Sequence, residues 1–177
     1  MPPFTWTSLP ELRSTRLLLR TLSPNDSADL FAIYGDPDVM EFASDPPFAD
    51  ASMVVQMLES TDHLFHEHQA LEWGVVHVNE QRVIGTCGIH SFTADGSAAE
   101  IGCLLARRYW GQGLMAEALT AVIDLAFDTL KLTAVLADID APNQRSQRLF
   151  HRLGFQLDPP RAPLLALSAD GWRARRG

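Results

Sequence analysis

Hydrophobic and polar positions follow two different periods along this 177-residue chain, and these periods predict its helices and strands. Apolar residues recur at helical spacing in several stretches; Leu114, Ala118 and Val122, for example, would share one helix face. Short β-rich runs bounded by turn residues predict strands. The expected helices are residues 23–34, 50–64, 113–129 and 143–153. The expected strands are residues 15–20, 71–78, 83–90, 98–106, 133–139, 155–157 and 164–167.

The order of these elements predicts an α/β fold in a single domain, residues 1–177. The runs at 71–78 and 83–90 indicate an antiparallel hairpin. Residues 98–139 indicate a strand–helix–strand unit with two parallel strands and a right-handed crossover. Gly35-Asp36-Pro37 is expected to end the first helix. We therefore expect a mixed, mostly antiparallel sheet of six or seven strands with about four helices.

The segment Arg-Tyr-Trp-Gly-Gln-Gly-Leu at 108–114 lies between a predicted strand and a predicted helix. Gly111 and Gly113 permit a tight turn in which several backbone N–H groups point into one hollow. The helix that follows adds the partial positive charge of its N-terminus. This arrangement predicts an anion site made by the backbone, and a pyrophosphate suits it well.

The same loop admits a second interpretation, because Gly111, Gly113 and Ala116 also fit the dinucleotide pattern G-x-G-x-x-A. Asp138 or Asp140 would then contact the ribose. Against this, the first glycine does not follow the strand directly, and the second half of a doubly wound fold is missing. A Walker A sequence is absent as well. A nicotinamide-dependent enzyme remains an alternative that cofactor binding would test.

Composition indicates a soluble globular protein, with 46% hydrophobic and 20% charged residues. The chain lacks an apolar run of the roughly 18–20 residues that span a bilayer. Its first residues lack the pattern of a signal peptide. Two cysteines, Cys87 and Cys103, agree with a reducing compartment. We therefore expect a cytoplasmic protein that does not bind membranes.

Charge is distributed unevenly around a net value of −8. Four arginines and one aspartate lie from residue 161 onward, so the rest of the chain is strongly acidic. An acidic body argues against nucleic-acid binding and favours a cationic or amine substrate. The histidines do not form a metal-binding pattern, so no metal is expected.

Several motifs in the second half of the chain resemble the GNAT acetyltransferases. Arg108, Gly111 and Gly113 form R-x-x-G-x-G, and Asn143 and Leu-Gly-Phe at 153–155 follow at the family's spacing. This resemblance implies an acetyl-CoA-dependent N-acetyltransferase. Its acceptor would be a primary amine, either a protein N-terminus or a small molecule, which attacks the thioester directly in a ternary complex.

Other segments are similar to one branch of that family, the ribosomal-protein N-terminal acetyltransferases. These are Thr-Arg-Leu-Leu-Leu-Arg at 15–20, Ala-Glu-Ile-Gly at 99–102 and Tyr-Trp-Gly-Gln-Gly at 109–113. The similarity covers residues 12–157, which would form the core of the domain. Residues 158–177 would be an atypical short C-terminal tail.

The resemblance also implies where acetyl-CoA binds. In this family it lies where two parallel strands splay apart, here 98–106 and 133–139. The splay would free backbone groups of Leu104, Leu105 and Ala106 for the pantetheine arm. The Leu104 N–H would donate to the acetyl oxygen in the transition state.

Further cofactor contacts follow from the same resemblance. Asn143 would contact the pantetheine arm and also cap its helix. Ser146 would lie near the thiol, as a weaker candidate for both binding and catalysis. The pyrophosphate would be held by Arg108, Tyr109, Trp110, Gly111, Gln112, Gly113 and Leu114, with Arg108 adding its charge.

Glu100 is the expected catalytic residue, because some group must take a proton from the acceptor ammonium before it can attack. Glu100 and Leu104 are four residues apart on one strand and therefore share a face. The proton could pass directly or through water, and a purely structural role for Glu100 stays open. His90, at the end of a central strand, is a weaker candidate for contacting the substrate.

Two features depart from the family pattern. Phe150 occupies the position where many relatives carry a tyrosine acid, so water or Ser146 would protonate the thiolate, or the thiolate would leave unprotonated.

In the tail, a turn at 169–171 precedes a segment, 172–177, that is too short and basic for a buried strand. The last strand would be truncated or supplied by another subunit, which predicts a homodimer through this sheet edge. A non-catalytic CoA-binding or interaction protein is the alternative.

Overall fold

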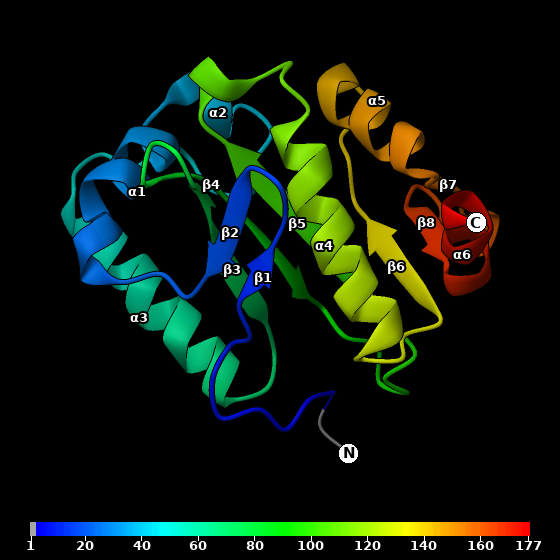
Figure 1. Cartoon of the computed structure of the whole chain (residues 1–177). Helices are drawn as coiled ribbons and strands as arrows, with labels where there is room; N and C mark the ends of the chain where they lie inside the picture. The colour runs from blue at the N-terminus through cyan, green and yellow to red at the C-terminus, as the bar shows by residue number, and fades with distance from the viewer. Residues whose placement is uncertain (1–2) are drawn as a thin grey trace.

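The computed structural model describes residues 3–177, whose strands form one eight-stranded sheet in the order β1-β2-β3-β4-β5-β6-β8-β7 (Figure 1). Neighbouring strands are antiparallel except β5 and β6, which are parallel. The strands are β1 Leu12–Arg13, β2 Leu17–Arg20, β3 Leu71–His77, β4 Arg82–His90, β5 Ala98–Leu105, β6 Ala134–Ala137, β7 Gln156–Leu157 and β8 Leu165–Ser168. The α-helices are α1 Ser27–Tyr34, α2 Pro37–Met40, α3 Ser52–His66, α4 Leu114–Asp128, α5 Gln144–Leu153 and α6 Ala169–Arg176.

The expected fold class is confirmed, and the sheet is mixed and mostly antiparallel. The strand beyond the seven predicted is β1, which has only two residues and therefore no detectable period. The helices beyond the four predicted are α2 and α6, both short. None of the helices in the described part of the chain is long and apolar enough to cross a membrane.

Two apolar clusters cover the two faces of the sheet. One cluster joins α4 to the sheet residues Trp73, Cys87 and Ile101, all buried. The other joins α1 to Val54 on α3 and to the β3–β4 hairpin. Figure 1 shows α4 lying across one face and α1 and α3 beside the other. Residues of β4 and β5 with odd numbers therefore face α4 over most of their length, and even-numbered residues face α1 and α3.

The prediction that residues 35–37 end the first helix is confirmed. Gly35 ends α1, and Pro37 begins α2. The Asp36 carboxylate accepts a hydrogen bond from the Asp38 N–H at 2.9 Å, which caps the new helix. Proline needs no N–H bond at the first helical position, so the same residue can end one helix and start the next.

The tail differs from the prediction. Residues 169–176 form α6, which begins where the Ser168 hydroxyl accepts from the Gly171 N–H at 3.0 Å. Trp172 is 7% exposed, and its Nε1 donates to Asp124 of α4 at 2.8 Å. Strand β8 inserts between β6 and β7. The tail thus completes the sheet of its own chain, and neither truncation nor a borrowed strand is needed.

Candidate functional site

The parallel strands β5 and β6 separate partway along their length, as expected. They pair only from Ala98 with Ala134 to Glu100 with Leu136. Beyond this point β5 continues to Leu105 and pairs only with β4. One edge of β5 is therefore open from residue 101 onward, and its backbone groups there lack a strand partner.

Hydrogen bonds at the two ends of β5 show which of its amides face this open edge. The Ala106 N–H donates to the Ile84 oxygen, next to β4, at 2.8 Å. The Thr133 N–H donates to the Ser97 oxygen, on the β6 side, also at 2.8 Å. The β4–β5 register has no shift between these points. Backbone groups alternate along a strand, so even-numbered residues of β5 bond toward β4 and odd-numbered residues face the opening.

This alternation corrects the prediction for Leu104. Its N–H faces β4, whereas the N–H groups of Cys103 and Leu105 face the opening. The Leu105 carbonyl does so too, since it accepts from Nε1 of Trp110 at 2.7 Å. Cys103 and Leu105 therefore both have an N–H that could meet an acyl oxygen in the opening.

The glycine loop closes one end of the opening with the expected geometry. Gly111 and Gly113 have φ values of +74° and +76°, in the left-handed region that favours glycine. Gly113 is the N-cap of α4. Arg16 braces the loop by donating to the Gln112 oxygen at 3.0 Å, and it pairs with Glu117 of α4 at 2.7 Å. The positive end of α4 is thereby held facing the opening.

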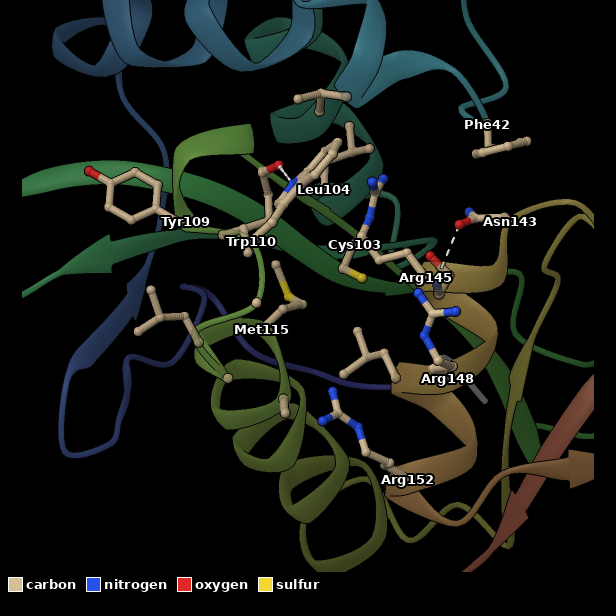
Figure 2. A pocket seen from close by; sticks show the side chains of 18 of the residues that line it. Phe42, Cys103, Leu104, Tyr109, Trp110, Met115, Asn143, Arg145, Arg148 and Arg152 are labelled. Carbon is tan, nitrogen blue, oxygen red and sulfur yellow. Dashed lines mark hydrogen bonds between the residues drawn. The ribbon is translucent and has the colours of Figure 1, made fainter.

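A cavity of about 590 Å³ lies at this place, a size typical of small-molecule sites. Figure 2 shows it between the glycine loop, β5, α4 and α5, with Phe42 at its far side. Nine residues predicted from the sequence line it: Leu104, Leu105, Tyr109, Trp110, Gly111, Gly113, Leu114, Asn143 and Ser146. Five predicted residues lie outside its lining: Glu100, Ala106, Arg108, Gln112 and His90.

Arg108 is held away from the cavity, contrary to the prediction. Its guanidinium pairs with Glu80 and lies 4.5 Å from the Tyr109 ring centroid. The Tyr109 hydroxyl donates to the same carboxylate at 2.6 Å. These neighbours hold the Arg108 charge over the β3–β4 hairpin, where it supports the loop from behind.

Three arginines of α5 supply the positive charge instead, and sequence reasoning missed them. Arg145, Arg148 and Arg152 project from α5 toward the cavity (Figure 2). Arg145 lies 3.4 Å from the Trp110 ring centroid, and burial lowers its pKa. Within residues 3–177 none of the three forms an ion pair, so their charge remains available to an anionic ligand. Their spacing of three and four residues was a signal that they share a helix face.

The positions of three further residues, Asn143, Phe150 and Cys103, are well defined in the fold. Asn143 caps α5, with its Oδ1 accepting from the Ser146 N–H at 3.2 Å. Phe150 is 3% exposed and packs edge-on against Phe155, so it belongs to the core. Burial raises the pKa of the Cys103 thiol to about 12. This thiol therefore stays protonated near neutral pH and is a poor nucleophile.

The face of the sheet toward α1 also carries a residue that the sequence reasoning missed. Glu72 of β3 is half-buried, and its Oε2 lies 1.9 Å from where a Cβ on Gly88 would be. Burial raises the pKa of Glu72 to about 7, and the nearby Thr86 hydroxyl opposes this shift. Thr86 is itself bonded to the Tyr34 hydroxyl at 2.8 Å.

The site consists of a splayed parallel strand pair, a left-handed glycine loop and an arginine-lined cavity. These features suit a protein that binds an extended phosphorylated ligand along an open strand edge. Residues 16–156 match the acetyltransferase (GNAT) domain family, and the chain belongs to this family. Family members transfer an acyl group from acetyl-CoA to an amine, so the protein is a GNAT-type N-acetyltransferase. The nicotinamide interpretation of the loop is therefore wrong.

Similar proteins support this assignment. The chain is 33% identical over 145 residues, 82% of each sequence, to the uncharacterized N-acetyltransferase p20 of Bacillus licheniformis. It is 34% identical over 95 residues to the ribosomal protein uS5 alanine N-acetyltransferase of Escherichia coli, which covers 52% of this chain and 48% of that protein.

Solved structures share the fold at lower identity. The spermidine N-acetyltransferase of Vibrio cholerae, in complex with CoA and spermine, superposes with a TM-score of 0.76 at 14% identity. The match covers 90% of this chain and 99% of that one. RimJ of Mycobacterium smegmatis, in complex with CoA-disulfide, gives 0.76 at 17% identity, with 92% and 87% covered.

Proposed function

We propose that this protein transfers the acetyl group of acetyl-CoA to the primary amine of a protein N-terminus or a cationic small molecule, by direct attack within a ternary complex. One observation carries the proposal: the open edge of β5 leads directly into the glycine loop. A single cavity thus offers unpaired amides for a pantetheine arm and a positive hollow for a pyrophosphate.

From one end of the cavity to the other, its residues would contact successive parts of acetyl-CoA. The Cys103 N–H faces the opening and would stabilise negative charge on the acetyl oxygen. The amides of the glycine loop would hold the pyrophosphate, and Asn143 would border the pantetheine arm. Arg148 and Arg152 would pair with the remaining phosphate charge. When bound, acetyl-CoA supplies the activated acyl group.

Direct transfer is supported by the poor nucleophilicity of the cavity thiol. Cys103 is the cysteine of the cavity, and its raised pKa keeps it protonated. A carboxylate would instead take a proton from the acceptor ammonium. Glu100, the candidate from the sequence, and Glu72 both lie on the sheet face toward α1. Ser146 and water remain the candidates for protonating the sulfur.

The acceptor class follows from the charge near the site. Glu72 and Asp45 both act on the charge of Tyr34, on the sheet face toward α1, and would favour a cationic amine over an acid there. The names of two similar proteins, one acting on an alanine of protein uS5 and one on spermidine, suggest the first acceptors to test.

A cytoplasmic location remains a prediction. The homodimer does too, although β7, at the sheet edge that motivated it, has only two residues.

The experiment combines a turnover assay with a binding assay. The protein is mixed with acetyl-CoA and one amine at a time: an alanine-initiated peptide, a serine-initiated peptide, spermidine and a set of other primary amines. Free thiol is followed with a chromogenic reagent, and CoA affinity is measured by calorimetry. We expect thiol release with at least one amine. Tight CoA binding without release for any amine would favour the non-catalytic alternative.

A further inference from the structure

Two glycines create a hollow on the acceptor face of the sheet, which we call the glycine hollow: the space over Gly88 and Gly102. These residues lie opposite each other on β4 and β5. The Glu72 carboxylate occupies the space over Gly88. Over Gly102, the His90 Nε2 is the one described atom within 4 Å of a constructed Cβ, at 3.4 Å. The hollow is therefore open above Gly102 and bordered by a carboxylate and an imidazole.

The glycine hollow lies beside the place where the acyl group would be. Gly102 directly precedes Cys103, whose N–H faces the opening between β5 and β6. Glu100, in contrast, lies where these strands are still paired, opposite Leu136. Its Cα is two residues from that of Gly102 on the same face, which is about 7 Å along a strand. The Glu72 carboxylate needs to reach across only one strand spacing, about 5 Å, from Gly88 to Gly102.

The surroundings of Glu72 suit a group that gains and loses a proton during turnover. Thr86 lies beside it and is bonded to Tyr34 of α1. The titratable groups that interact with its charge are Tyr34, Cys87 and Cys103, and burial raises the pKa of all three. His90 and Glu100 border the same hollow. Within residues 3–177, Glu72 has no ion-pair partner that would hold it permanently ionised.

We propose that the acceptor nitrogen binds in the glycine hollow above Gly102 and that Glu72 is the carboxylate that takes its proton. The inference rests on the proposed transferase function and assigns Glu72, rather than Glu100, to proton removal. His90 borders the nitrogen from the other side. Because the hollow is narrow and lacks side chains at Gly88 and Gly102, it would admit a primary amine on an unbranched or lightly substituted carbon.

In the proposed reaction, the acceptor ammonium gives one proton to the Glu72 carboxylate, and the free amine attacks the thioester carbonyl carbon. The C–N bond forms, and the C–S bond breaks as the sulfur leaves with its electron pair. The second nitrogen proton reaches that sulfur through water, and Glu72 returns the first proton to solvent. The products are an amide, the CoA thiol and one proton.

The first test compares Glu72→Gln, Glu100→Gln and the control Glu59→Gln, which alters an exposed carboxylate of α3. The kcat/KM for the fastest amine of the panel is measured between pH 6 and 9. We expect Glu72→Gln to lower it about 100-fold and to remove its rise near pH 7. CoA affinity should stay within twofold, and Glu59→Gln should match the wild type. A normal rate and pH profile in Glu72→Gln would overturn the assignment, as would loss of the rise in Glu100→Gln alone.

A second test uses Gly102→Ala, which places a methyl group in the hollow at ordinary contact distance from His90. We expect KM for the amine to rise at least tenfold while KM for acetyl-CoA is unchanged. An unchanged KM for the amine would place its nitrogen elsewhere. A rise in both KM values would show a general disturbance of β5 and would likewise count against the hollow.

A third measurement needs no turnover and so separates this inference from the proposed function. Carbon-13 NMR of labelled glutamate, assigned by the signal missing in Glu72→Gln, should show this carboxyl titrating near pH 7. Titration near pH 4, as for an ordinary glutamate, would overturn the role of Glu72. An enzyme that releases no thiol with any amine would instead contradict the proposed function.

Discussion

The two halves of the site are built from different parts of the chain. The donor half, where acetyl-CoA would lie, consists mainly of backbone: the open edge of β5 and the left-handed loop at Gly111 and Gly113. The acceptor half, where the amine would lie, would consist of side chains, among them Glu72 and His90, that the neighbouring strands β3 and β4 bring together. A site made of backbone needs a local sequence pattern, whereas a site made of side chains needs the sheet to bring them together. The first is therefore easier to find from a sequence than the second.

The largest expected effect tests whether charge from α5 completes the donor half. Replacing Arg148 and Arg152 with alanine removes two cations that have no ion-pair partner in residues 3–177. We expect CoA affinity to fall about 100-fold, roughly 1.4 kcal/mol for each charge-assisted contact. Calorimetry at two salt concentrations should show a weaker salt dependence in the double variant. Arg173→Ala, on the exposed side of α6, serves as the control and should bind normally.

The second prediction asks whether the backbone of the glycine loop binds the donor or merely shapes the fold. Gly111→Ala and Gly96→Ala are a matched pair, since both glycines have a positive φ and open space around a constructed Cβ. Each substitution should cost about 1 kcal/mol of folding free energy. Only Gly111→Ala should also weaken CoA binding, about tenfold. Equal CoA affinity in the two variants would mean that the loop does not contact the ligand.

The third prediction concerns the proposed acceptor half and the free-energy cost of ionising its half-buried carboxylate, Glu72. Because the pKa of Glu72 is raised to about 7, the folded state binds its proton more tightly than the unfolded state. This stabilising contribution is full at low pH and is lost as the pH rises through about 7. Glu72→Gln should therefore be more stable than the wild type at pH 8, on the order of 1 kcal/mol after allowance for solvent screening.

Thermal unfolding of both proteins at pH 5 and pH 8 measures this difference. The gain in Tm should be larger at pH 8 and should shrink toward pH 5. A gain of equal size at both values would mean that glutamine packs better there, with no contribution from charge.

The smallest effect is expected for Arg108, the residue that the sequence motif favoured. Its guanidinium is held by Glu80 and Tyr109 outside the cavity. Arg108→Ala should change CoA affinity less than twofold and lower stability by less than about 1 kcal/mol, since the pair is exposed. A loss of affinity as large as that from Arg148 and Arg152 would show that Arg108 turns toward the ligand when it binds.

The sequence predicted local features of the fold better than features that depend on contacts between distant segments. The glycine loop and the cap at Asn143 were predicted because each depends on a local pattern, and the splay of two strands was expected from the family resemblance. The tail was mispredicted, since α6 is stabilised by the contact of Trp172 with Asp124, 48 residues away. Leu104 was assigned the wrong amide direction because the register with β4, not the spacing along β5, decides which groups face the opening.

The sequence alone indicated the family, the α/β class and the left-handed glycine loop of the donor half, because glycine spacing and helix starts impose backbone geometry directly. Only the tertiary structure decided which charges reach the cavity and which carboxylate borders the acceptor side. Arg108 and Arg148 have the same side chain, and their roles differ by the neighbours they meet. The pKa of Glu72 likewise depends on burial beneath elements far apart in the chain, a property that local sequence does not carry.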